Sequence, residues 1–132
     1  MPQKIEMIAA LRARLVPELR QRGFKGSLPH FRRARSGAID LLTVQFDRHG
    51  GGFIVEIAKC EPEGVTTYWG AKIPPNKVTA HDLHPNERHR LGALGPNQDG
   101  RWFRFDDGVS TEAVSSELIR MLAEADSWWI AG

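Results

Sequence analysis

Apolar residues recur at helical spacing near both ends of the chain. The first series takes three- and four-residue steps and predicts a helix over 3–22. Its members are Ile5, Ile8, Leu11, Leu15 and Leu19. Pro17 lacks an amide donor and its ring crowds the preceding turn, so we expect a kink or break near 13–16. The second series, Val114, Leu118, Met121, Leu122 and Ala125, predicts a helix over 111–126. The closing segment 128–130 is expected to pack back onto the body.

The middle of the chain alternates between apolar and polar positions, as half-buried strands do. Strands are predicted over 30–35, 39–47 and 53–58. The first has Phe31 as its only large apolar residue, which is typical of an edge strand guarded by arginines. The glycines at 50–52 provide the loop of a hairpin between the other two strands.

The second half of the chain is less regular. We predict a third core strand over 65–69, paired with the strand before it, and short strands over 88–94 and 102–105 on either side of a loop at 95–100. The stretch 70–87 contains prolines and asparagines that oppose helix and strand. Irregular segments of this length in small domains are commonly functional or mobile.

The order of elements predicts the fold class. Helix, strands, loop, strands and helix follow one another, without the alternation of parallel βαβ units. We therefore predict an α+β fold, in which an antiparallel meander sheet of about five strands is flanked by an N-terminal and a C-terminal helix. The length of 132 residues fits one domain over 1–132.

Charge, cysteine content and the lack of targeting patterns bear on the expected cellular compartment. Residues 1–50 carry ten Lys and Arg against four Asp and Glu, whereas 51–132 carry eight against twelve. The single Cys60 cannot form an internal disulfide, and we interpret it as a small buried apolar residue. The chain shows neither a secretory signal pattern nor an apolar run long enough for a membrane helix. These features predict a cytoplasmic protein without a membrane partner.

Three histidines gather in the segment His81–His89. Together with its carboxylates, His81, His84 and His89 are candidate metal ligands. Pro85 opposes a helix that would align the first two, so we favour a solvated loop over a metal site. No cofactor is expected.

The arginines and the tryptophans are also candidates for binding a partner. The basic region Arg20–Arg35, with Phe31 and Tyr68 available for stacking, suits single-stranded nucleic acid. An edge strand guarded by arginines explains the same residues, and we prefer it. The four tryptophans fill a core, or in part line a groove for a protein partner.

Short landmarks carry a family resemblance. They are Gly23-Phe24-Lys25 after the first helix, Phe31-Arg32, the strand 39–46, Arg90-Leu91-Gly92 and Arg101-Trp102-Phe103. In this order the chain resembles the bacterial domain of unknown function 4304 family over nearly its whole length. The resemblance implies a small α+β domain of bacterial origin, and it brings no established activity and no catalytic residues.

The combined observations favour a non-enzymatic accessory domain that binds another protein or a second copy of itself. Toxin antagonists are one class of such proteins, and this inference rests on analogy of class. The candidate contact residues are Arg32, Tyr68, Trp69, His84 and Trp102. Two alternatives stay open: a small-ligand or metal-binding protein or enzyme built on His81–His89, and nucleic-acid binding through Arg20–Arg35.

Overall fold

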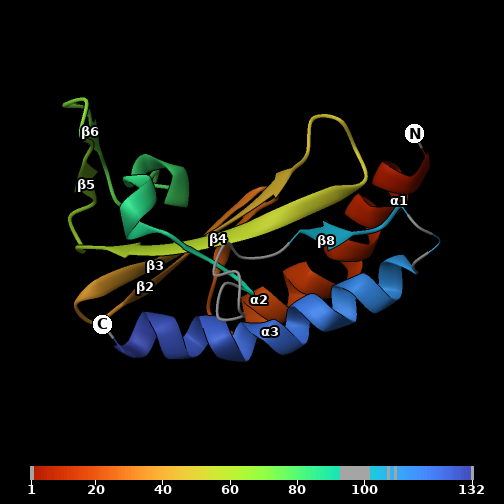
Figure 1. Ribbon diagram of the computed structural model, residues 1–132. Coiled ribbons are helices and arrows are strands. Elements are labelled where there is room, and N and C mark those ends of the chain that lie inside the picture. The colour runs from red at the N-terminus through yellow and green to blue at the C-terminus, as the bar shows by residue number, and fades with distance from the viewer. Residues whose placement is uncertain (1, 93–101, 107, 109, 132) are drawn as a thin grey trace.

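The fold is α+β, with an antiparallel sheet and helices on one of its faces (Figure 1). The computed structural model describes residues 2–92, 102–106, 108 and 110–131. The predicted loop at 95–100 and the landmark residue Arg101 lie outside the described residues.

The N-terminal helix contains the irregularity that Pro17 predicts. Helices α1 (Pro2–Ala10) and α2 (Val16–Gln21) are joined by a π-helical turn, Leu11–Leu15. The amide of Val16 donates to the carbonyl of Leu11, five residues back. This wider turn accommodates a proline ring without ending the helix. The residues that face the core are Met7, Leu11, Leu15, Val16 and Leu19, whereas Ile5, predicted on the apolar side, is 69% exposed.

The main sheet has six strands in the described part of the chain. They are β1 (Lys25–Ser27), β2 (His30–Arg35), β3 (Ala38–Phe46), β4 (Gly52–Cys60), β7 (His89–Arg90) and β8 (Phe103–Arg104). Strands β1 to β4 form an antiparallel meander, and both β7 and β8 pair with β4. The predicted hairpin around the glycine loop is confirmed as β3 and β4.

Helix α3 (Thr111–Ala131) covers the same sheet face as α1 and α2 (Figure 1). It begins where predicted, because the Ser110 hydroxyl accepts from the amides of Glu112 and Ala113. It continues through 128–130, which buries Trp129 against the sheet. None of the described helices combines the length and the apolar content that crossing a bilayer would require.

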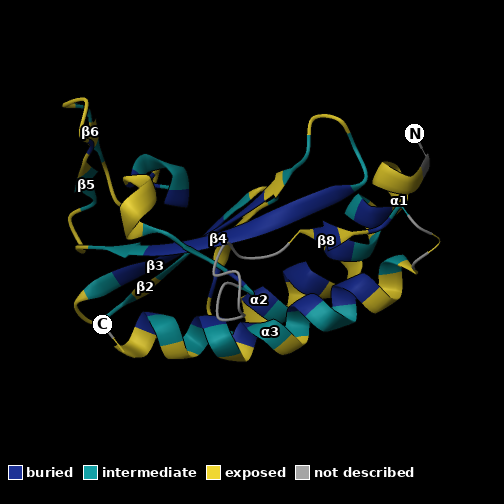
Figure 2. Ribbon diagram, in the orientation of Figure 1, coloured by how far each residue is buried: buried dark blue, intermediate teal, exposed yellow. Residues whose placement is uncertain are grey.

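Residues 61–88, here called the cover segment, lie against the other face at one end of the sheet (Figure 1). They contain the short strands β5 (Val65–Thr66) and β6 (Lys72–Ile73) and two 3-10 turns, Ala80–Asp82 and Pro85–Glu87. Their apolar side chains form a small second core with the sheet: Ile39, Leu41, Ala58, Val78, Ala80 and Leu83. The prediction of a third core strand over 65–69 is wrong, because β5 pairs with β6 in a separate two-stranded sheet. Figure 2 shows this hairpin largely exposed.

Candidate functional site

The five predicted contact residues occupy three places in the structure. Tyr68, Trp69 and His84 form one exposed cluster on the cover segment. Arg32 lies on β2, and its side chain lines a separate hollow. Trp102 is 42% exposed and precedes β8, at the opposite end of the sheet from β5 and β6 (Figure 1). The structure therefore brings together three of the five.

The aromatic cluster is a set of interlocking rings. The Tyr68 and Trp69 centroids lie 4.9 Å apart with their planes at 87°, and the Tyr68 and His84 centroids lie 5.3 Å apart at 70°. Edge-to-face contacts of this kind are favourable for aromatic rings. Tyr68 is nevertheless 73% exposed and Trp69 57% exposed. The rings thus support one another while most of their surface faces solvent.

A tight turn fixes the first two rings. The amide of Gly70 donates to the Thr67 carbonyl at 2.9 Å, and the amide of Thr67 donates to the Ala71 carbonyl at 2.8 Å. The buried Thr67 hydroxyl also accepts from the amide of Ala71 at 2.9 Å. Gly70 has φ +91°, a conformation that glycine adopts without strain. Tyr68 and Trp69 occupy the two central positions of this turn, so their side chains project away from the body.

The third ring is fixed by a different element. His84 caps the 3-10 turn Pro85–Glu87: its Nδ1 accepts from the amide of Asn86 at 3.1 Å. The amide of His84 donates to Glu87 Oε1 at 3.2 Å. These bonds use one ring nitrogen and hold the imidazole against Tyr68.

The three candidate metal ligands do not converge. His81 Nε2 lies 3.3 Å from Glu56 Oε1, while His89 Nε2 lies 2.8 Å from Glu124 Oε2. His84 packs on Tyr68 instead. Within the described residues, no three Asp, Glu, His or Cys side chains are placed to share a metal ion. The three histidines have separate partners because they lie on three different elements: His81 and His84 on two different 3-10 turns, and His89 on β7.

Glu56 is the centre of a polar cluster that attaches the cover segment to the sheet. Its carboxylate lies 3.4 Å from Arg88 and 3.6 Å from Arg90. The His81 imidazole, followed by the charges of these arginines, holds the pKa of Glu56 below its usual value, although burial opposes the effect. His81 Nε2 is buried and makes no well-directed hydrogen bond despite its proximity to the carboxylate.

Arg88 is anchored further by the cover segment itself. It donates to the carbonyls of Leu83 and His81 at 3.1 Å each. Because its partners are backbone carbonyls and one carboxylate, the arrangement serves to hold the segment in place. Glu56, whose pKa is lowered, is ionised at neutral pH and is therefore poorly suited to act as a general acid.

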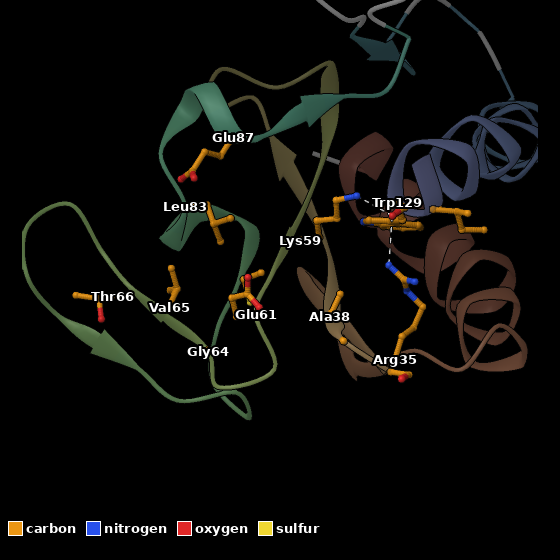
Figure 3. A pocket seen from close by; sticks show the side chains of 14 residues that line it. Arg35, Ala38, Lys59, Glu61, Gly64, Val65, Thr66, Leu83, Glu87 and Trp129 are labelled. Carbon is orange, nitrogen blue, oxygen red and sulfur yellow. Dashed lines mark hydrogen bonds between the residues drawn. The ribbon is translucent and has the colours of Figure 1, made fainter. Parts of the chain in front are cut away.

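A hollow of about 590 Å³ lies between the sheet end, the cover segment and the end of α3. Figure 3 shows Arg35 and Lys59 on one side, and Val65 and Leu83 on the other. Both cations donate to the Trp129 carbonyl, at 3.2 Å from Arg35 and 2.8 Å from Lys59. They therefore complete the C-terminal end of α3.

Cys60 also lines this hollow. Burial, followed by the negative charges of Glu61, Asp82 and Glu63, raises the pKa of the Cys60 thiol to about 11. A thiol with this pKa is protonated at neutral pH and is a weak nucleophile. Cys60 was predicted to be a small buried apolar residue, and the structure leaves it only partly buried.

Within the basic region Arg20–Arg35, the arginines of β2 are divided between the two sheet faces. Arg33 and Arg35 donate to the fully buried Asp40, with Nε distances of 2.9 and 2.6 Å to its Oδ2. The Arg33 guanidinium also lies over the Phe24 ring at 4.5 Å. Arg32 faces the other way, because successive side chains of a strand alternate. The three β2 arginines therefore do not lie on a single face of the sheet.

Asp40 and Glu56 were not identified as structural residues from the sequence. Each is the only carboxylate in a mainly apolar strand, β3 or β4. Such a position requires a charged or hydrogen-bonding partner, because an unpaired buried charge is very costly. That pattern could have revealed both clusters, although not which cations supply the pairing.

Comparison with known proteins identifies the family. No curated protein and no solved structure matches this chain. The family described as "Domain of unknown function (DUF4304)" matches residues 15–132, which include every described strand and α3. The match spans most of the chain and agrees with the resemblance found in its landmarks. The protein is a member of the DUF4304 family.

Proposed function

We propose that this domain is a non-enzymatic binding protein whose Tyr68–Trp69–His84 cluster contacts a protein partner. The observation that carries the proposal is the exposure of two large aromatic side chains on a turn held by hydrogen bonds. Aromatic residues dominate the binding energy of protein interfaces, and a fixed cluster loses little conformational entropy on binding.

The rim of the cluster also favours a protein. Exposed charges of both signs lie on the elements beside it, with Lys72 on β6 and Glu87 in the turn that His84 caps. A polar rim of mixed charge around an aromatic centre is usual for protein interfaces. Nucleic acid would instead require cations that follow a phosphate backbone.

The hairpin that carries Tyr68 and Trp69 contacts the body through only part of its length. Val65 and Ile73 are partly buried against the second core, whereas Tyr68 and Trp69 project beyond it. A projecting tip can enter a concave surface of the partner without rearrangement of the sheet or helices. We therefore expect binding to leave the body of the domain unchanged.

The first experiment identifies what touches the tip. A photo-crosslinking amino acid, p-benzoylphenylalanine, replaces Tyr68, and in a control protein it replaces the equally exposed Ile5 on α1. The expected result is a protein adduct formed at position 68 in cells of the source organism and absent at position 5. Adducts at both positions would contradict the proposal.

The second experiment measures the affinity with purified partner. Trp69→Ala is expected to weaken binding at least tenfold, because central interface tryptophans commonly contribute that much. The matched control is Trp102→Ala, which removes a partly exposed tryptophan at the other end of the sheet. Equal losses in both variants, or a loss in neither, would overturn the assignment. Sedimentation velocity of the free protein shows whether the partner is a second copy of the chain.

A further inference from the structure

A second hollow, of about 410 Å³, lies on the sheet face that the cover segment partly covers. Its lining comes from the turn after α2, from β1, β2 and β3, and from the cover segment. The volume is within the range of small-molecule sites. The aromatic cluster proposed above contributes no residue to it.

The floor and one wall of this hollow are apolar. Ala34 and Ile39 come from neighbouring strands, where they are directly paired, and Pro62 and Pro75 come from the cover segment. Prolines give a rigid wall, since their ring fixes the backbone φ angle. A ligand body that packs here would therefore be apolar.

The cations of the hollow are only partly neutralised. Arg35 is bound to Asp40 and to the Trp129 carbonyl. Lys25 and Arg32, in contrast, form no ion pair or side-chain hydrogen bond with any residue that the structure describes. The Arg32 Nε is buried and has no hydrogen-bond partner among those residues. No acidic side chain lines the hollow.

The register of the sheet places two positive charges of the hollow next to each other, which is unfavourable for the stability of the fold. Lys25 and Arg32 are direct partners across the β1–β2 ladder, so their side chains emerge side by side on one face. Like charges at directly opposed positions destabilise a sheet. No acidic side chain among the described residues pairs with either of them, so an external anion placed here would remove the repulsion.

We propose that this hollow binds a small organic carboxylate with an apolar body. The guanidinium of Arg32 presents paired N–H donors that match the two oxygens of a carboxylate, and Lys25 adds a second positive charge. The apolar body lies over Ile39 between Pro62 and Pro75. This site is separate from the aromatic cluster and does not depend on the proposed protein partner.

The test follows binding by NMR of the 15N-labelled protein, including the Arg Nε–Hε signals. The probes are hexanoate, its uncharged amide hexanamide, acetate and inorganic phosphate. Hexanoate is expected to shift the Arg32 Nε–Hε signal and the amides of β1 and β2 saturably. Hexanamide lacks the charge, acetate and phosphate lack the apolar body, and each is expected to bind at least tenfold more weakly.

Two variants assign the contact. Arg32→Gln is expected to weaken hexanoate binding at least tenfold, and Lys25→Gln to weaken it by a smaller factor. The matched control is Arg12→Gln, which removes the same charge from an exposed position on the N-terminal helix. The dispersion of the amide spectrum verifies that each variant is folded.

A stability readout separates binding from a structural role. Arg32→Gln removes a like-charge neighbour of Lys25, so its melting temperature is expected to be equal to or higher than that of the parent protein. A lower melting temperature would assign Arg32 to the fold and overturn the proposal. Equal binding of hexanamide or phosphate, or unchanged hexanoate binding in Arg32→Gln, would also overturn it.

Discussion

The two faces of the sheet are packed in different ways. The face under the helices holds one large core with stacked and tilted aromatic rings, including Phe53, Phe103 and Trp129. The opposite face holds a small core of six residues, beside which Glu56 attaches the cover segment by charge. Regions with fewer buried apolar contacts open more easily than the main core. The helix face is therefore expected to determine global stability, whereas the other face carries both proposed binding surfaces.

The two faces differ most clearly in how they hold a buried carboxylate. Asp40 on the helix face is fully buried and is bound by Arg33 and Arg35. Asp40→Ala leaves both guanidinium groups without their shared acceptor, and it is expected to reduce the free energy of unfolding by about 3–5 kcal/mol. Urea unfolding measures the change.

Glu56→Ala is the matched test on the other face. Its carboxylate lies closer to solvent than that of Asp40, and the cover segment can move without exposing the helix core. A loss smaller than that of Asp40→Ala is expected. Equal losses would show that both charge clusters belong to one cooperative unit, and would contradict the proposed difference between the faces.

A pair of leucines tests the same difference without charge. Leu83→Ala in the small core is expected to cost about 2 kcal/mol, at the lower end of the range for buried leucines. Leu118→Ala in the large core is the control and is expected to cost more. Hydrogen exchange should show faster exchange within 61–88 for the first variant and throughout the domain for the second. Faster exchange throughout in both would contradict a separately opening cover segment.

The free energy of unfolding is expected to depend on pH through His30, whose ring lies beside the cover segment. Its Nδ1 lies 2.9 Å from the Thr43 hydroxyl, and its ring packs edge-on against His81. Burial, followed by the charges of His81 and Arg32, lowers the pKa of His30 from 6.5, although Asp82 opposes this.

The unfolded state therefore binds more protons than the folded state as the pH falls through about 6.5. The free energy of unfolding is expected to decrease over that interval, and His30→Gln is expected to reduce the slope. Urea unfolding at several pH values measures it, with the exposed His49→Gln as control. An unchanged slope in His30→Gln would exclude this histidine as the source.

The sequence predicts the fold well where the spacing of apolar residues and the residues of the adjoining turn indicate the same element. The alternation in β3 and β4 and the glycines between them identify the central hairpin, because a half-buried strand repeats every two residues. The same criterion fails at 65–69, where a short alternation belongs to a hairpin outside the main sheet. Two residues of strand carry too little pattern to specify their partner.

The candidate site is predicted by residue type but not by position. Tyr68, Trp69 and His84 are aromatic residues in an irregular segment, which identifies them as candidates, yet their contact depends on how two separate turns fold. The apolar spacing of the first helix places Ile5 on the buried side, but the structure exposes it and buries Met7 instead. Sequence spacing describes an ideal helix and cannot report a wider turn.

The smallest expected change in the free energy of unfolding is that of Trp69→Ala, and it is compared here with Trp129→Ala. Trp129 donates from its ring nitrogen to the Ala58 carbonyl at 2.9 Å and is buried, so its replacement by Ala is expected to cost about 3–5 kcal/mol. Trp69→Ala removes a largely exposed ring and is expected to change the free energy of unfolding by less than about 0.5 kcal/mol. Urea unfolding of both variants measures the difference. A loss above about 1 kcal/mol in Trp69→Ala would mean that the ring supports the hairpin. A loss near zero would mean that stability does not require a tryptophan on this turn, as the proposed role of Trp69 in binding predicts.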